Sequence, residues 1–445
     1  MIYRLVRKLI KIALFFFFKK IVVTGKKNML HQGPLIIVAN HPNTLMDPLI
    51  IASIMKQQIG FLGNAGLFSN PFLGHLLKYF NVIPVFRKKD IAKGEKPNNK
   101  YSFSKCHDYL DEKGTILIFP EGSSYYELKL REIKTGTARI ALSYESLQGL
   151  DSSLKILPIA LDYSDAIQFR SMVSVTIDEP ISVQNYKKLY LKNEFDSVVQ
   201  LTETIRQKLD KHIPNTTNKE QEQFLLKTHK FYTTFNEPTA DLYINPKQSL
   251  VSRAQISKSL YFLNDNNHEL YTNTETKVHL FFDQINNEKL TPGFFTESFL
   301  QKNKAIVISG YFLKFIALAP LYIFGLLTNY VPYILPFVIF KISKLELEYK
   351  TSLQMIVGLI SFPLFYWLEI IVFKSYFDIS FWNSWLLLIA FLISGYIAMY
   401  YWTEVKRFKR VLHFFFLMKQ EKKLSILKLR DEILINIEIA KSNLQ

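Results

Sequence analysis

Short apolar runs rich in β-branched residues alternate with helical patterns from about residue 35 to residue 183. The runs predict strands at 35–39, 59–62, 82–86, 115–119, 156–161 and 172–177. Apolar residues at helical spacing predict helices near 45–55, 71–80, 101–112 and 133–144. Strands and helices that take turns favour an α/β layer fold with a mostly buried sheet.

The hydrophobic pattern changes after this segment. Residues 185–304 are polar and mostly helical in pattern, and they carry no motif that indicates a chemistry. Residues 351–373 and 380–402 are predominantly apolar and long enough to span a bilayer. A short polar loop separates them, so we expect a tight transmembrane hairpin and therefore an integral membrane protein.

The apolar stretch 305–340 is harder to interpret because Lys314 and three prolines interrupt it. Basic residues cluster before 351 and after 402, which places both flanks of the hairpin on the cytoplasmic side. If the α/β domain is also cytoplasmic, 305–340 must return to its starting side. We therefore expect a re-entrant or interfacial pair of helices there. Two complete short crossings would also return the chain to its starting side.

The first 28 residues combine Lys8, Lys11, Lys19 and Lys20 with four consecutive phenylalanines. Their uninterrupted apolar run is too short to span a membrane. The pattern favours a basic, aromatic helix that lies in the interface of an anionic membrane. The alternative is a helix packed on its own domain.

These patterns divide the chain into five expected parts. They are an interfacial helix at 1–28, the α/β domain at 29–184, a helical polar region at 185–304, a membrane region at 305–402 and a basic cytoplasmic helix at 403–445.

Composition indicates an anionic partner. Lysine and arginine outnumber aspartate and glutamate by 55 to 38, which gives a formal net charge of +17. The basic residues flank apolar, membrane-like segments, so we expect a phospholipid membrane rather than nucleic acid as the partner. The single cysteine, Cys106, excludes an internal disulfide and a cysteine zinc cluster.

Candidate chemistry begins where the first strand ends, in the stretch LIIVANHPNTLMDPLI at 35–50. A neutral imidazole such as His41 can take a proton from an alcohol, and a carboxylate such as Asp47 can fix its tautomer and stabilise the imidazolium. A metal site would need more ligands at suitable spacing, and the sequence offers none nearby. The remaining alternative is a polar strand-to-helix turn with Thr44 as the N-cap.

Later blocks place further polar residues at the ends of strands. Arg87 follows the strand at 82–86, and its guanidinium can bond a phosphate there. Glu121 and Gly122 form a Pro-Glu-Gly turn after 115–119. Lys134 and Gly136 stand where a helix opens, and the free N–H groups at that helix start suit an anion. Each block alone has a plain structural explanation, but a coincidence of all of them in this order is much less probable.

The order of these motifs resembles the glycerolipid acyltransferase family, which contains glycerol-3-phosphate and 1-acylglycerol-3-phosphate O-acyltransferases. The resemblance covers about residues 35–183, and the Phe-Pro-Glu-Gly block at 119–122 meets the family's pattern outright. It implies that His41 is a general base oriented by Asp47. It also implies that the acceptor and its phosphate are bound by Asn40, Arg87, Glu121, Gly122, Lys134, Gly136 and Arg139.

Two departures from the family pattern matter. Most members have four residues between the histidine and the aspartate, whereas here there are five. One extra residue turns a helical side chain by about 100°, so the turn at Pro42 and Asn43 must absorb it. The longer spacing is similar to a branch that uses glycerol 3-phosphate or dihydroxyacetone phosphate. In addition, Ser124 stands where many relatives have an arginine, which shifts the expected phosphate contacts to Arg87, Lys134 and Arg139.

The resemblance implies acyl transfer from a thioester of coenzyme A or acyl-carrier protein to a glycerol-phosphate hydroxyl. It implies a catalytic domain on the cytoplasmic face of a membrane, with no metal and no tightly bound organic cofactor. The acceptor stays open between glycerol 3-phosphate and 1-acylglycerol 3-phosphate. The alternatives are another lipid acceptor, such as an aminolipid, and a non-enzymatic membrane protein with a decayed acyltransferase fold.

Overall fold

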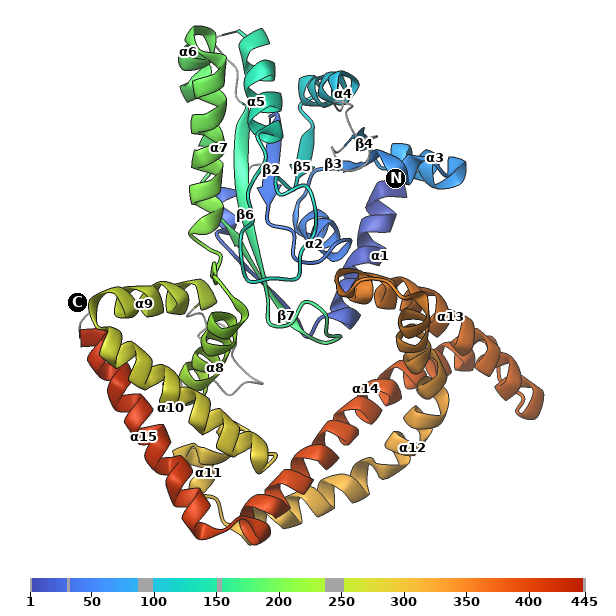
Figure 1. Ribbon diagram of the computed structural model, residues 1–445. Helices are drawn as coiled ribbons and strands as arrows, with labels where there is room; N and C mark the ends of the chain where they lie inside the picture. The colour runs from blue at the N-terminus through green and yellow to red at the C-terminus, as the bar shows by residue number, and fades with distance from the viewer. Residues whose placement is uncertain (1, 30–32, 87–98, 150–153, 237–251, 443–445) are drawn as a thin grey trace. The chain divides into compact units, whose positions relative to one another are not determined.

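The computed structural model describes residues 2–29, 33–86, 99–149, 154–236 and 252–442 (Figure 1). The chain forms two compact units. The first, here called the α/β unit, consists of Met1–Asn215 and Ser343–Ile356. The second, called the helical unit, consists of Thr216–Ile342 and Val357–Gln445.

A mixed sheet forms the centre of the α/β unit, in the order β1-β7-β6-β2-β5-β3-β4, with β8 paired to β6. Its strands are β1 (Lys20–Thr24), β2 (Leu35–Ala39), β3 (Ile59–Asn64), β4 (Val82–Val85), β5 (Thr115–Ile118), β6 (Lys155–Tyr163), β7 (Met172–Ile177) and β8 (Ile181–Ser182). The central strand β2 runs parallel to both of its neighbours, β5 and β6. The predicted α/β fold is confirmed, and β1 and β8 are the two strands that the sequence pattern missed.

Helices cover both faces of this sheet (Figure 1). They are α1 (Ile2–Phe17), α2 (Met46–Ile54), α3 (Pro71–Tyr79), α4 (Lys100–Asp111), α5 (Gly136–Leu147), α6 (Gln184–Lys192) and α7 (Glu194–Asp210). Alternate residues of β2 point to opposite faces. Ile36 and Val38 lie in a core cluster with α4, α5 and α7, whereas Leu35 and Ile37 lie in a second cluster with α1 and α2. All of β2 is buried, which explains its uninterrupted apolar sequence.

The α/β unit is larger than the expected domain at 29–184. It begins earlier, because β1 pairs with β7 inside the sheet. It ends later, because Leu201, Ile205 and Leu209 of α7 are buried in the first core cluster. The polar region expected at 185–304 is therefore divided between the two units.

The N-terminal helix α1 has features of both alternatives for the first 28 residues, a helix packed on its own domain and a helix at a membrane interface. Leu14 and Phe17 are buried in the second core cluster, and Arg7 donates to the carbonyls of Met55 and Lys56, so one side packs on its own domain. Another side exposes Leu5, Leu9, Ile12 and Phe15. An exposed apolar stripe beside basic residues is the pattern of a helix that touches a membrane interface.

The helical unit contains α8 (Lys219–Phe235), α9 (Arg253–Asn266), α10 (His268–Asn287), α11 (Glu297–Leu300), α12 (Lys304–Ser343), α14 (Phe381–Leu412), α15 (Gln420–Ser442) and, from residue 357 onward, α13 (Lys350–Tyr376). The segment 403–445 was expected to be a basic helix on the cytoplasmic surface. Instead, α14 continues to Leu412, and α15 packs on α10 and buries Ile426 and Ile433.

Three helices among the described residues are long and apolar enough to cross a membrane, and they lie at Lys304–Ser343, Leu347–Tyr376 and Phe381–Leu417. The last two contain the expected hairpin. The expectation of a helix pair at 305–340 is wrong, because α12 is one continuous helix through Pro320, Pro332 and Pro336. A proline at 336 frees the carbonyl of residue 332, and the Ser361 hydroxyl of α13 donates to that carbonyl at 3.2 Å.

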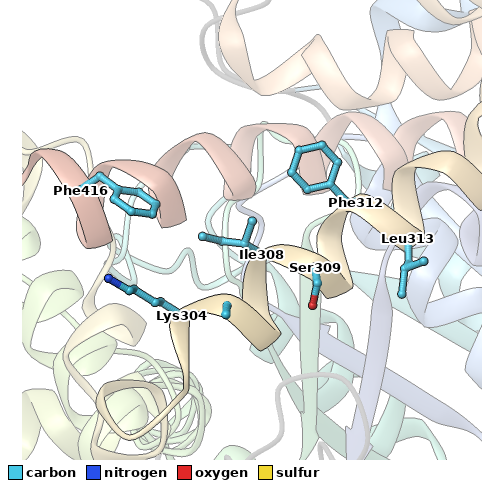
Figure 2. A pocket seen from close by; sticks show the side chains of 7 residues that line it. Lys304, Ile308, Ser309, Phe312, Leu313 and Phe416 are labelled. Carbon is cyan, nitrogen blue, oxygen red and sulfur yellow. The ribbon is translucent and has the colours of Figure 1, made fainter.

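An open groove of about 610 Å³ lies at the start of α12 (Figure 2). It is lined by Lys304, Ala305, Ile308, Ser309, Phe312, Leu313 and Phe416. None of the predicted site residues that the structure describes lines it, and its walls belong to the apolar surfaces of two candidate spans. The groove is therefore not the candidate functional site.

Candidate functional site

The candidate site lies at one edge of the sheet, where three neighbouring strands end. Because β2 runs parallel to β5 and β6, their carboxyl ends meet at the same edge. His41 follows β2, Glu121 follows β5, and Tyr163 is the last residue of β6. Ligands of α/β sheets gather at this edge.

His41 and Asp47 form a hydrogen-bonded pair. The Nδ1 atom of His41 lies 2.7 Å from Oδ2 of Asp47, which is fully buried in the first turn of α2. The same Oδ2 accepts the backbone N–H of Asn43 at 2.7 Å, and Oδ1 accepts the hydroxyl of Tyr163 at 2.5 Å. The turn at 42–45 thus absorbs the fifth intervening residue, and the carboxylate still reaches the imidazole.

A stacking contact on one ring face also holds the imidazole of His41 in place. Its ring stacks on that of Phe119, with centroids 3.9 Å apart and an interplanar angle of 11°. With Nδ1 hydrogen-bonded to Asp47, the second nitrogen, Nε2, has no hydrogen-bond partner in the part of the chain that the structure describes. The side chain keeps 17% of its surface exposed, so Nε2 can receive a proton from a bound molecule.

Tyr163 is a site residue that the sequence analysis missed. Its side chain is buried, and burial, followed by the neighbouring Asp47 carboxylate, raises the pKa of Tyr163 well above its ordinary value. The phenol is therefore a proton donor to Asp47 at any physiological pH. No local motif marks this role, because the two residues are 116 positions apart in the sequence.

Glu121 ties the loops of the site together. Its Oε1 accepts the backbone N–H of His41 at 2.9 Å, and its Oε2 accepts the backbone N–H of Arg131 at 3.1 Å. Burial raises the pKa of Glu121, and the hydrogen bonds from the two N–H groups oppose that rise. Both carboxylate oxygens are occupied by backbone donors, so the side chain orients His41.

Asn40 extends the pairing of two strands. Its Nδ2 donates to the carbonyl of Leu161 at 2.9 Å, and its Oδ1 accepts the N–H of the same residue at 2.7 Å. The side chain is buried, and it copies the hydrogen bonds of one more strand residue between β2 and β6. Asn40 was expected to bind the acceptor, but its polar atoms are used in fixing the start of the loop that carries His41.

Gly122 and Lys134 lie against each other. Gly122 has φ +73°, a conformation that favours glycine, and a Cβ there would stand 2.6 Å from Nζ of Lys134. The Lys134 backbone N–H donates to the carbonyl of Pro120 at 2.8 Å, which holds the lysine beside the Pro-Glu-Gly turn. Gly136 is the first residue of α5, two positions further on.

Among the described residues, the expected phosphate-binding Arg139 has no hydrogen bond or ion pair with this cluster. Arg139 is exposed one turn into α5, and its charge partly opposes the rise that burial and Glu194 cause in the pKa of Tyr190 of α6. Arg87 lies outside the described residues. A different cation lies beside the site: the guanidinium of Arg131 lies 3.6 Å above the ring of Tyr125, whose N–H donates to the carbonyl of His41.

Ser124 and Thr44 complete the loop contacts. The Ser124 hydroxyl, at the position where an arginine is common in the resembled family, accepts the N–H of Thr44 at 2.9 Å. Thr44 is not the N-cap of α2, because that position is taken by Leu45, which has no capping side chain. Among the described residues, no group of three or more histidine, cysteine, aspartate or glutamate side chains is placed to hold a metal ion.

Comparison with known proteins identifies the class of this domain. Residues 20–162 match the model of the family described as Acyltransferase. The resemblance drawn from the motifs is confirmed: the segment is an acyltransferase-family domain, and its homologues include glycerol-3-phosphate and 1-acylglycerol-3-phosphate acyltransferases.

The individual relatives are distant. An uncharacterised acyltransferase of Schizosaccharomyces pombe is 23% identical over 276 residues, which cover 43% of this chain and 41% of that protein. Glycerol-3-phosphate O-acyltransferase 2 of Saccharomyces cerevisiae is 33% identical over 118 residues, or 26% of this chain and 16% of that protein. The chain thus spans less than half the length of these two relatives.

Two bacterial proteins are matched over most of their length. The 1-acyl-sn-glycerol-3-phosphate acyltransferase of Borreliella burgdorferi is 29% identical over 215 residues, or 45% of this chain and 79% of that enzyme. The crystal structure of the 1-acyl-sn-glycerophosphate acyltransferase from Thermotoga maritima is matched with a TM-score of 0.31 and 20% identity, over 45% of this chain and 79% of that one.

Proposed function

We propose that this protein is a membrane-bound O-acyltransferase that moves a fatty acyl group from an acyl thioester to a glycerol-phosphate hydroxyl. The acceptor is glycerol 3-phosphate or 1-acylglycerol 3-phosphate, and the product enters phosphatidic acid and phospholipid synthesis. The donor is a thioester of coenzyme A or of acyl-carrier protein. One observation carries the proposal: His41 is bound to the buried Asp47 through Nδ1 and keeps Nε2 available at the carboxyl edge of the sheet.

In the proposed reaction, Nε2 of His41 takes the proton of the acceptor hydroxyl as its oxygen attacks the thioester carbonyl carbon. The carbon–oxygen bond forms, and a tetrahedral oxyanion results. The oxyanion collapses, the carbon–sulfur bond breaks, and the imidazolium returns the proton to the leaving thiolate. Asp47 stabilises the imidazolium between the two transfers. No metal and no tightly bound organic cofactor take part.

The acceptor phosphate is proposed to contact Lys134 and the first N–H groups of α5 around Gly136. Three features support this position: the lysine is exposed, it lies against Gly122, and free N–H groups at a helix start attract anions. Arg131 offers a second cation beside Tyr125, although it also pairs with Glu127 at 2.6 Å. Arg87 keeps its proposed phosphate contact on the resemblance alone.

Membrane residence fits such a reaction because the acylated product is a lipid. The three apolar helices support an integral membrane protein. We propose that the α/β unit faces the cytoplasm, where the thioester donor is soluble. The basic residues that flank the apolar helices support this orientation.

The test uses the full chain purified in detergent, with a radiolabelled acyl donor and each acceptor in a separate reaction. We expect one acceptor to be acylated and His41→Ala to lower the rate by about 10²–10⁴-fold. His268→Ala, an exposed histidine of the helical unit, is the matched control and should keep the wild-type rate. Transfer that survives His41→Ala would exclude the proposed base. Folded protein that acylates neither acceptor would contradict the proposed substrate class.

A further inference from the structure

We propose that the hydroxyls of Thr351 and Ser352, at the start of α13, are positioning residues that hold the catalytic loop at 41–47. The inference rests on the proposed function, because that function makes the loop at 41–47 catalytic. It concerns residues more than 300 positions from His41, near the start of the candidate membrane span at Leu347–Tyr376.

The start of α13 is built into the α/β unit. Ser343–Ile356 belongs to that unit, although most of α13 does not. Met355 is buried in the core cluster that includes Met46 and Ile50 of α2. Thr351 and Ser352 are also buried, with 1% and 4% of their surface exposed. Apolar packing therefore brings the two hydroxyls to the loop before α2.

Thr351 acts on the catalytic pair through Asn43. Its Oγ1 donates to Oδ1 of Asn43 at 2.9 Å, and Nδ2 of Asn43 donates to the carbonyl of Ala166 at 2.7 Å. The backbone N–H of Asn43 in turn donates to Oδ2 of Asp47, the same atom that meets His41. The side chain of Asn43 is thus fixed at both ends, and this fixes the N–H that orients Asp47.

Ser352 holds the next two residues of the loop. The hydroxyl of Thr44 donates to the carbonyl of Glu348 at 2.9 Å, so the Ser352 hydroxyl donates to Oγ1 of Thr44, also at 2.9 Å. Oγ of Ser352 accepts the N–H of Leu45 at 3.3 Å. Because Leu45 has no capping side chain of its own, Ser352 supplies a hydroxyl acceptor at the start of α2 from a distant helix.

This arrangement gives the loop a tight geometrical constraint. The reacting groups of an enzyme must be placed to within a fraction of an ångström, and a misplacement of about 1 Å lowers the rate by about 10²-fold. Loss of either hydroxyl leaves the packing of Met355 intact but frees the loop. We therefore infer an effect on turnover that exceeds any effect on folding.

The test compares Thr351→Val, which keeps the shape and removes the donor, with Thr351→Ser, which keeps the donor. Ser352→Ala is tested beside them. Ser375→Ala is the control, because Ser375 is an exposed serine of the same helix that bonds only its own turn. We expect Thr351→Val and Ser352→Ala to lower kcat about 10- to 100-fold with little change in KM. Thr351→Ser and Ser375→Ala should keep the wild-type kcat.

Amide hydrogen exchange tests the inference without activity. Thr351→Val should speed exchange in peptides that contain Asn43, whereas Thr351→Ser should not. Wild-type kcat and unchanged exchange in Thr351→Val would overturn the inference. An equal loss in Thr351→Val and Thr351→Ser, matched by a lower melting temperature, would also overturn it, because that result indicates packing alone. If the wild type acylates neither acceptor, the proposed function fails, and the exchange result decides the hydrogen-bond role by itself.

Discussion

Asp47 depends on three donors, and one of them comes from outside the motif that contains it. His41 and the Asn43 N–H are neighbours in the sequence, but Tyr163 arrives from the end of β6. A buried carboxylate is stable only when its oxygens are hydrogen-bonded. The histidine–aspartate pair therefore requires the whole edge of the sheet and not only its own loop.

Replacing Tyr163 by phenylalanine tests this dependence. The variant keeps the ring and leaves one oxygen of Asp47 without its donor, which costs about 1–3 kcal/mol for a buried charged acceptor. We expect a lower free energy of unfolding and a fall in kcat of about 10-fold or more. Thermal unfolding and steady-state rates measure both. Tyr186→Phe, which loses a hydroxyl bonded to Thr204 outside the site, is the control; an equal rate loss there would contradict a specific role.

The sequence predicted the residues of the site better than their contacts. His41 and Asp47 were recognisable because they are close in the sequence and their chemistry is distinctive. The Glu121 turn was recognisable as a motif, but its two backbone partners were not, because a carboxylate in a turn has no sequence signal for what it accepts. Tyr163, Thr351 and Ser352 could not be found, since only the tertiary fold brings them to the loop.

Among the elements, strands were predicted well and the helix at 305–340 was not. A proline interrupts a helix in water because the freed carbonyl and the ring need compensation. In apolar surroundings, neighbouring helices supply that compensation, as Ser361 does for the carbonyl of Pro332. The strand β1 was missed because its sequence directly follows the phenylalanine run, and the two were interpreted together as one interfacial segment.

Close approach of α12 and α14 gives a prediction for these helices. A Cβ at Gly325 would lie 2.1 Å from the carbonyl oxygen of Ser394, whereas a Cβ at Gly310 of the same helix would meet nothing within 4 Å. Alanine is favoured over glycine inside a helix by about 1 kcal/mol, so Gly310→Ala should be neutral or stabilising. Gly325→Ala should destabilise by about 1–3 kcal/mol because the backbones must separate. Melting temperatures in detergent compare them, and equal values would refute the close packing.

Glu288 joins α10 to the two segments that follow α14. Its oxygens lie 2.6 Å from Nζ of Lys422 and 2.7 Å from Nε2 of His413. The hydrogen bond from Lys422, then that from His413, holds the pKa of Glu288 below its ordinary value of 4.5. Its carboxylate therefore stabilises the folded state above the ordinary pKa, and this contribution is lost as the pH falls through the lowered folded-state pKa.

Glu288→Gln should consequently lower the free energy of unfolding at pH 7 by roughly 1 kcal/mol, a modest figure because Lys422 is largely exposed. The difference from the wild type should shrink as the pH falls below the ordinary pKa of 4.5. Unfolding curves measured from pH 7 to below pH 4.5 show whether the difference in the free energy of unfolding shrinks or grows on acidification. Glu438→Gln removes an exposed ion pair with Lys441 and serves as the control. A difference between Glu288→Gln and the wild type that grows on acidification would contradict the assignment.

At the scale of the whole molecule, the unit that carries the site is discontinuous. The chain completes Met1–Asn215, forms much of the helical unit, and returns with Ser343–Ile356 before entering the rest of α13. Composition and apolar runs predicted a membrane protein with an α/β domain. They could not predict that residues 343–356 belong to the α/β unit, because this segment has no motif. The role of Thr351 and Ser352 is visible only in the fold, where they bond to Asn43 and Thr44.

This organisation predicts that a fragment ending at residue 215 lacks part of the site. Without Met355, Thr351 and Ser352, the fragment exposes apolar surface of α2 and leaves the loop at 41–47 without two of its anchors. We expect a lower melting temperature, fast amide exchange in the loop, and acyl transfer reduced by about 10²-fold or more. Joining 343–356 to the fragment through a flexible linker of about 30 glycines and serines, with a root-mean-square reach of roughly 30 Å, should restore protection of the loop.

The linked fragment separates two roles of α13. If it regains both loop protection and transfer to a soluble acceptor, the first turn of α13 is sufficient for the chemistry, and the spans serve to keep the product at the membrane. If loop protection returns while transfer does not, the helical unit contributes to catalysis in addition to the two hydroxyls. A fragment 1–215 that is as stable and as active as the full chain would show that the returning segment is dispensable, and it would refute the dependence of His41 and Asp47 on α13.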